Sequence, residues 1–135
     1  MNRVTSLILS FVLVGAFEAA VRAQEAPKEP FKAVHLLNLK SAADVAALQA
    51  GIADMNKVVA DAGYKDIRYR LYKVTGKQAG PYAYMWESSW PGGDVYDKIH
   101  KSAAWTASMT KHPQLEAIMK DELYNRYAEV TAAKK

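Results

Sequence analysis

The chain has 135 residues and a formal net charge of +4, and 50% of its residues are hydrophobic. This length suits a single domain with its own core. The basic residues are scattered rather than gathered on one helix face, which argues against a nucleic-acid partner. There is no cysteine, so a disulfide framework is excluded and the domain must rely on its hydrophobic core.

The first 23 residues have the layout of a secretory signal peptide. Arg3 lies in a short positive start, residues 7–17 are apolar, and the small residue Ala23 precedes the expected cut. Glu18 ends the apolar run well short of the roughly 20 residues that a bilayer span needs. We therefore expect cleavage after Ala23, a periplasmic or secreted protein, and no stable membrane span once the signal is removed. An uncleaved anchor and a cytosolic start are the alternatives.

The rest of the chain divides into a linker, a domain and a tail. Residues 24–30 are polar and hold two prolines, which is typical of an extended linker. The folded domain is expected over residues 31–130, followed by a disordered tail at 131–135. At the start of the domain, FKAVHLLNLK (31–40) is apolar on both faces of a strand, so we expect this strand to be buried on both sides.

A helix is predicted to follow this strand. Ser41 begins a sequence that resembles a capping box, and Gly63 supplies the left-handed conformation that ends a helix. Between them, apolar residues recur at three- and four-residue steps and form one stripe: Val45, Leu48, Ile52, Met55 and Val59. Gly51 lies off this stripe. It either costs about 1 kcal/mol of helix propensity or allows close packing against a neighbouring element.

The second half of the domain is predicted to contain a hairpin, two helices and a last strand. Residues 66–76 and 82–90 are strands joined by a short glycine-containing turn, which indicates an antiparallel hairpin. A second helix is expected from about residue 94 to residue 111, and a short helix follows Pro113. Residues 123–130 form the final strand.

The resulting order, β-α-β-β-α-β, predicts a ferredoxin-like α+β fold. In this arrangement a four-stranded antiparallel sheet carries its helices on one face. The first strand, however, is apolar on both faces. We therefore expect a second copy of the chain to cover the open face, with two sheets meeting in a symmetric homodimer, because a monomer would expose an unusually large apolar patch.

Three segments resemble the dimeric α+β barrel superfamily: HLLNLK in the first strand, WES at the end of the third strand, and HKSAAW in the second helical region. This superfamily includes antibiotic-biosynthesis-type monooxygenases, heme-degrading monooxygenases, stress-responsive barrel proteins, and the NIPSNAP and EthD groups. The resemblance spans about residues 31–130. It implies the dimeric α+β barrel fold and a homodimer.

The heme-degrading branch implies a triad of Asn, Trp and His. Asn38 matches the Asn position of this triad. The positions that correspond to Trp and His are occupied by Ile99 and Met109, and Trp90 and His100 cannot be placed there without a gap. We therefore expect no cofactor, because the triad that would accompany heme is not matched; heme is the alternative.

Strand alternation divides the YMWESSW segment between the two faces of the sheet. Tyr84 and Trp86 point to one side and Glu87 to the other. Tyr84 and Trp86 either pack in the core or form a pocket wall. Glu87 is expected to pair with Arg68 or Arg70 on the neighbouring strand.

The histidines offer proton-transfer chemistry but no metal site. His100 borders the apolar stripe of the second helix, where an imidazole that titrates near neutrality suits proton transfer; a half-exposed surface histidine is the alternative. His35 is either a hydrogen-bonded core residue or part of a cavity at the dimer interface. The histidine spacing matches no metal motif and cysteine is absent, so no metal site is predicted.

These observations predict an exported homodimer that binds a small hydrophobic or aromatic molecule between helices and sheet. The expected ligand-binding residues are His35, Asn38, Tyr84 and Trp86. One alternative is a cofactor-free monooxygenase of the antibiotic-biosynthesis type, in which His100 removes or relays a proton and Asn38 holds an oxyanion. The other alternative is a structural or assembly protein without a ligand.

Overall fold

The computed structural model describes residues 28–131. The predicted signal peptide lies outside the described residues, as do most of the predicted linker and most of the predicted tail. Within the described range, no helix has both the length and the apolar character needed to cross a membrane.

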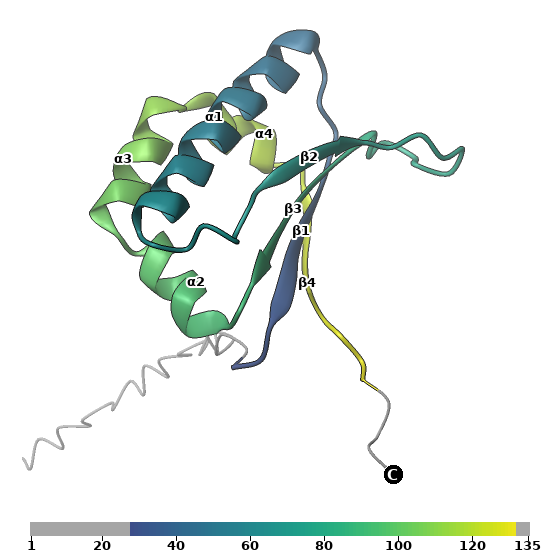
Figure 1. The fold of residues 1–135 in the computed structure, drawn as a ribbon. Helices are drawn as coiled ribbons and strands as arrows, with labels where there is room; N and C mark the ends of the chain where they lie inside the picture. Colours follow the sequence, from purple (N-terminus) through teal and green to yellow (C-terminus); the bar gives the residue numbers. More distant parts are fainter. Residues whose placement is uncertain (1–27, 132–135) are drawn as a thin grey trace, which may run out of the picture.

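One antiparallel sheet carries all the helices on one of its faces (Figure 1). The elements in chain order are β1 (Phe31–Leu37), α1 (Ala42–Asp61), β2 (Arg70–Lys73), β3 (Tyr84–Trp90), α2 (Gly93–His100), α3 (Ala103–Lys111), α4 (Gln114–Met119) and β4 (Leu123–Ala128). The strand order is β2-β3-β1-β4, with β3 and β1 at the centre. The predicted ferredoxin-like α+β fold is confirmed.

Both ends of α1 are capped as the sequence predicts. At its start, the Ser41 hydroxyl accepts a hydrogen bond from the backbone N–H of Asp44, at 3.1 Å. At its end, Gly63 has a φ of +95°, and its N–H donates to the Ala60 carbonyl at 3.0 Å, while the next N–H reaches back to Val59. This is the Schellman pattern, which satisfies carbonyls at the end of the helix.

The second strand is shorter than predicted because a side chain of α1 takes the backbone hydrogen bonds of Tyr69. Asn56 on α1 accepts from the backbone N–H of Tyr69 at 2.7 Å and donates to the Tyr69 carbonyl at 3.0 Å. Both backbone groups of Tyr69 therefore bond to a helix side chain, and β2 begins only at Arg70. The same bonds hold the buried Tyr69 ring beneath the helices.

The prediction of one continuous helix from about residue 94 to residue 111 is wrong. The chain turns at Lys101 and Ser102, and two helices, α2 and α3, take its place. Ser102 has extended backbone angles; its hydroxyl donates to the Ile99 carbonyl at 2.7 Å and accepts from the Trp105 N–H at 3.1 Å. The hydroxyl thus terminates α2 and caps α3. The break leaves the rings of His100 and Trp105 with centroids 4.1 Å apart.

Gly51 allows α1 to approach α4 closely. A Cβ atom at this position would lie 2.6 Å from Cδ1 of Leu115, which is fully buried. The close-packing explanation for Gly51 is therefore the one that the structure supports. The core lies between the helices and the sheet and contains the buried residues Phe31, Ala33, Leu37, Leu48, Ile52, Met55, Val59, Ile67, Tyr69, Trp86, Trp90, Ile99 and Leu115.

The opposite face of the sheet carries no helix (Figure 1). On β1, Val34 and Leu36 point to this open face and are half-buried within one copy. Three large side chains on the neighbouring strands are well exposed: Tyr72 at 40%, Leu123 at 42% and Tyr127 at 51%. The register pairs Leu36 with Leu123 and Lys32 with Tyr127, so these residues form one continuous and partly apolar surface.

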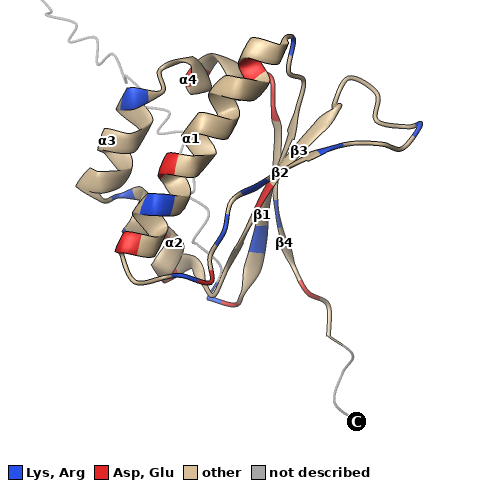
Figure 2. Cartoon of the chain, turned by 45° about the horizontal axis from the view of Figure 1, so that its top comes forward, with Lys and Arg blue, Asp and Glu red and all other residues tan. Residues whose placement is uncertain are grey.

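Glu87 also lies on the open face, but its predicted pairing with Arg68 or Arg70 is wrong. Its carboxylate accepts from Lys32 Nζ at 3.3 Å and from the Tyr72 hydroxyl at 3.1 Å. Arg70 stands opposite Glu87 in the strand register without forming an ion pair with it in the part of the chain described. Elsewhere, acidic and basic residues are interspersed over helices and loops (Figure 2).

Candidate functional site

A cavity of about 200 Å³ lies between the helices and the covered face of the sheet. Its lining residues are Ala33, His35, Tyr69, Trp86, Ser88, Tyr96, His100, Trp105, Met109 and Met119. Aromatic rings and thioethers make up most of the wall. Pockets that enclose drug-sized molecules measure about 300–1,000 Å³, so this cavity suits a molecule built on a single ring.

The cavity stands out by its chemistry rather than its size. A larger hollow of about 360 Å³ lies near Tyr64, Ile67 and Pro91, but it contains no histidine. The cavity between helices and sheet brings His35 and His100 into one wall, although they lie far apart in the sequence. It is therefore the candidate functional site.

His35 and Trp86 meet because β1 and β3 pair directly. The register places His35 opposite Trp86, and side chains opposite each other on one face of a sheet are neighbours. Their rings stack with centroids 4.3 Å apart and planes 14° from parallel. Tyr124 on β4 packs against the other side of His35, with a centroid separation of 4.6 Å.

His35 forms a short hydrogen bond with a carboxylate. Its Nδ1 lies 2.6 Å from Oε2 of Glu122, and the two side chains are only 14% and 18% exposed. A carboxylate accepts hydrogen bonds, so Nδ1 is the donor, and in the neutral ring Nε2 carries the lone pair. Within residues 28–131, Nε2 has no hydrogen-bond partner. His35 therefore lines the cavity with one ring nitrogen that has no partner among the described residues.

His100 has both ring nitrogens engaged. Nδ1 donates to the Tyr96 carbonyl at 2.7 Å, and Nε2, at 3.2 Å, accepts from the Tyr69 hydroxyl. Burial lowers the pKa of His100 from its ordinary 6.5 to about 4, although the hydrogen bond to the Tyr96 carbonyl acts in the opposite direction. His100 is therefore neutral at pH 7 and anchored between α2 and the start of β2.

Trp86 carries a buried polar group without a partner. The residue is 3% exposed, and its indole N–H has no hydrogen-bond acceptor among the described residues. Trp90, four residues further along the same strand and on the same face, differs in this respect, since its indole N–H donates to the Ser88 hydroxyl at 2.8 Å. Buried donors are normally paired, so the exception at the cavity wall is informative.

A cationic side chain lies one layer behind the cavity. Arg126 on β4 donates from Nε to the Tyr124 hydroxyl at 2.8 Å, and its guanidinium lies 4.5 Å from the centroid of the Tyr96 ring, within the range of a cation–π contact. Burial raises the pKa of Tyr96 well above its ordinary value. Tyr96 therefore stays protonated and serves as wall rather than as an acid.

Of the residues predicted to form the site, His35, Trp86 and His100 line the cavity, whereas Asn38 and Tyr84 do not. Asn38 follows the end of β1, and its side-chain amide lies 3.1 Å from the Pro81 carbonyl, so it ties the strand end to the β2–β3 connection. Tyr84 packs at the margin of the core. A ligand-binding role for each predicted residue, and a catalytic role for His100, remain predictions.

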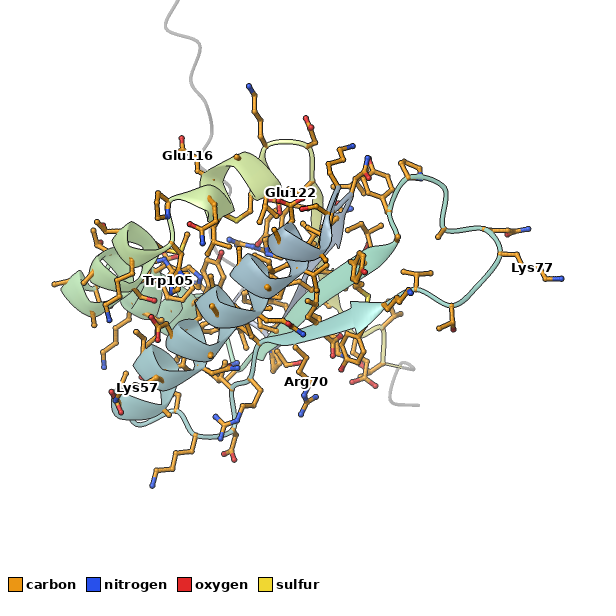
Figure 3. All side chains as sticks on the ribbon, turned by 90° about the horizontal axis from the view of Figure 1, so that it is seen from above. Lys57, Arg70, Lys77, Trp105, Glu116 and Glu122 are labelled. Carbon is orange, nitrogen blue, oxygen red and sulfur yellow. The ribbon has the colours of Figure 1, made fainter. Side chains whose placement is uncertain are left out.

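The sequence interpretation missed several lining residues and the partner of His35. Trp105 lines the site only because the chain turns at Ser102. Tyr69 lines it because Asn56 binds both backbone groups of Tyr69. Glu122 had a usable signal: β1–β4 pairing puts Tyr124 opposite His35, so Glu122, two residues earlier, lies diagonally across on the same side. Figure 3 shows Trp105 and Glu122 on the helix side, away from Lys77 in the β2–β3 connection.

The described residues show no cluster of metal-ligating side chains. Over the described residues, no cluster of three or more His, Asp or Glu side chains is arranged to hold a metal ion. The cavity volume of about 200 Å³ is below the range typical for drug-sized ligands, and the absence of a heme cofactor stays a prediction.

Comparisons with known proteins identify the fold. No protein-family model matches the sequence, and no curated protein does. Among solved structures, a dimeric ferredoxin-like protein of unknown function from Thermobifida fusca aligns with a TM-score of 0.51 and 14% identity, over 78% of this chain and 93% of that one. A DABB family protein with a ferredoxin-like fold from Mesorhizobium loti aligns with a TM-score of 0.53 and 10% identity, over 76% and 98%.

A hydroxynitrile lyase from Passiflora edulis has a TM-score of 0.55 and 12% identity, over 78% of this chain and all of that one (100%). The chain is therefore similar in fold to ferredoxin-like and stress-responsive α+β barrel proteins. The resemblance to the dimeric α+β barrel superfamily is confirmed in fold, and at these identities the likeness does not extend to activity.

Proposed function

We propose that this chain is an exported, homodimeric α+β barrel protein that binds a small aromatic molecule between its helices and its sheet. One observation carries the ligand site: the buried indole N–H of Trp86 has no acceptor, and Trp86 lines an aromatic cavity. Leaving a buried donor unpaired costs about 1–3 kcal/mol. A ligand oxygen that accepts from this N–H would recover that cost.

The walls of the cavity suit a planar ring. Tyr69, Tyr96 and Trp105 contribute aromatic surface, and Met109 and Met119 contribute thioethers, which adapt their shape to a ligand. Aromatic side chains favour offset and edge-to-face contacts with another ring. The expected ligand is therefore a single substituted ring that carries at least one hydrogen-bond acceptor.

Phenol binding, measured by calorimetry, tests this proposal. Trp86→Phe keeps an aromatic ring and removes the N–H, so phenol affinity should fall roughly fivefold to tenfold, the equivalent of a hydrogen bond worth about 1 kcal/mol. Trp90→Phe is the matched control, because it removes an N–H that already has its acceptor in Ser88. An absence of binding by phenol and by its apolar analogue toluene would show that the cavity is not a ligand site.

The dimer is proposed on the open face of the sheet. Leu36, Tyr72, Leu123 and Tyr127 provide apolar surface there without any covering helix, and a second sheet would bury it. The solved structure from Thermobifida fusca, described as a dimeric ferredoxin-like protein, supports a dimer for a chain of this fold. Leu123→Glu should convert a dimer into a monomer in sedimentation equilibrium, whereas Glu116→Lys on α4 should not. A wild-type monomer at micromolar concentration would refute the dimer.

Export is proposed from the pattern of the first 23 residues. N-terminal sequencing of the protein recovered from outside the cytoplasm should begin at Gln24. Recovery of a chain that still begins at Met1 would contradict cleavage.

A further inference from the structure

We propose that His35, positioned by Glu122, removes a proton from an acidic hydroxyl group of a phenol or enol bound in the cavity, and that the indole N–H of Trp86 stabilises the resulting oxyanion. This inference rests on the proposed ligand site and adds a substrate class and a reaction to it. It assigns the base to the histidine on β1 rather than to the histidine on α2.

The hydrogen bond between His35 and Glu122 prepares one ring nitrogen for this task. Because Nδ1 donates to the carboxylate at 2.6 Å, the tautomer is fixed and the lone pair is left on Nε2. Both side chains are more than four-fifths buried, which limits competition from solvent. A carboxylate behind an imidazole orients the ring and stabilises the imidazolium that forms when Nε2 accepts a proton.

The other histidine of the cavity lacks these properties. His100 already uses Nδ1 on the Tyr96 carbonyl and Nε2 on the Tyr69 hydroxyl. To accept a ligand proton, it would have to give up the Tyr69 bond and become charged in a buried place. The two histidines therefore have different roles: His100 is a structural residue of the cavity wall, and His35 accepts the proton of the ligand.

Trp86 supplies the complementary group. Its ring stacks on that of His35 with centroids 4.3 Å apart, and both residues line the cavity, so the unpaired N–H and the base belong to neighbouring side chains. A hydrogen-bond donor placed where negative charge develops is the usual way in which a site stabilises an oxyanion. An acidic hydroxyl uses both groups, since it loses a proton and gains a charge at one oxygen.

The charges balance without any further reactant. The O–H bond of the ligand breaks, its electron pair stays on oxygen, and the proton forms a new N–H bond at Nε2 of His35. The carboxylate of Glu122 neutralises the imidazolium. The rings that contact His35 are those of Trp86 on β3 and Tyr124 on β4. Return of the proton to oxygen or carbon regenerates the base.

The chromophore 4-nitrophenol tests this step with the full chain, because its phenolate has a separate visible absorption band. At about one unit below the pKa of free 4-nitrophenol, binding to the wild-type protein should produce the phenolate band. His35→Gln should bind the compound and lose the band. Glu122→Gln keeps the imidazole but removes the negative charge that stabilises the imidazolium, and should reduce the bound phenolate fraction at least fivefold.

Matched variants and a matched ligand separate the possible results. Glu116→Gln changes an exposed glutamate on α4 and should leave the band unchanged. The ether 4-nitroanisole has no proton to lose, so its affinity should change less than about twofold in Glu122→Gln. Circular dichroism and thermal unfolding verify that each variant is folded; if His35→Gln is not, Glu122→Gln decides.

Each outcome has one meaning. If neither 4-nitrophenol nor 4-nitroanisole binds to the wild-type protein, the proposed ligand site itself fails. If 4-nitrophenol binds in its protonated form, the ligand site stands and the assignment of His35 as base is overturned. The assignment is also overturned if the phenolate band persists undiminished in the folded His35→Gln and Glu122→Gln variants.

Discussion

Burial of His100 predicts a specific loss of stability in mild acid. The His100 ring has a pKa of about 4 in the native protein, against 6.5 ordinarily. Between these two pH values, the ring is protonated in the unfolded chain and neutral in the native chain. Stability should therefore be unaffected above about pH 6.5 and should fall by about 1.4 kcal/mol for each pH unit below it, down to about pH 4. The whole window corresponds to about 3 kcal/mol, of which about 2 kcal/mol is lost by about pH 5.

Urea unfolding at about pH 7 and about pH 5, at one fixed protein concentration, measures this loss. His100→Gln removes the titrating group while keeping a side chain that can hydrogen-bond to Tyr69. The variant should be less stable than the wild type at neutral pH and should lose about 2 kcal/mol less on acidification. Equal losses in the two proteins would refute the argument that burial holds His100 neutral.

Two further substitutions test the packing that shapes the site. Gly51→Ala should gain about 1 kcal/mol of helix propensity but lose about 1–3 kcal/mol by overpacking against Leu115. In a Leu115→Ala background the same substitution should increase the free energy of unfolding. An increase in both backgrounds would contradict the close approach of α1 and α4. Ser102→Ala should cost about 1 kcal/mol in urea unfolding through loss of the α3 cap, and a cost no greater than that of the exposed control Thr110→Ala would contradict that role.

The fold was predictable because its signals are local and repeat along the chain. Alternation marked the strands, the stripe on α1 marked a helix with one buried face, and Ser41 and Gly63 marked its ends. The β-α-β-β-α-β order then leaves few arrangements. The break between α2 and α3 at Ser102 was not predicted, because the sequence Ser-Ala-Ala-Trp is compatible both with a continuous helix and with the start of a second helix. Tertiary packing of Trp105 decides between them.

The candidate site was less predictable than the fold because it depends on the register of the strands and on which hydrogen-bond partner each side chain finds. Trp86 was recognisable as an inward-facing aromatic, but its unpaired N–H follows from the absence of a nearby acceptor, which no local pattern encodes. The strand end matters in the same way. Because β1 ends at Leu37, the alternation of strand side chains does not determine the direction of Asn38. Its side chain bonds to the β2–β3 connection instead.

The two histidines of the cavity show how one fold gives the same side chain two roles. His35 donates a hydrogen bond from Nδ1 to the Glu122 carboxylate, and the same carboxylate stabilises the imidazolium that forms when Nε2 accepts a proton. His100 meets the Tyr96 carbonyl and the Tyr69 hydroxyl, and its neutral form satisfies both partners. A base must gain a proton during its function, whereas a wall residue must keep one protonation state. The partners of each ring, more than its position in the cavity, therefore determine which histidine can react.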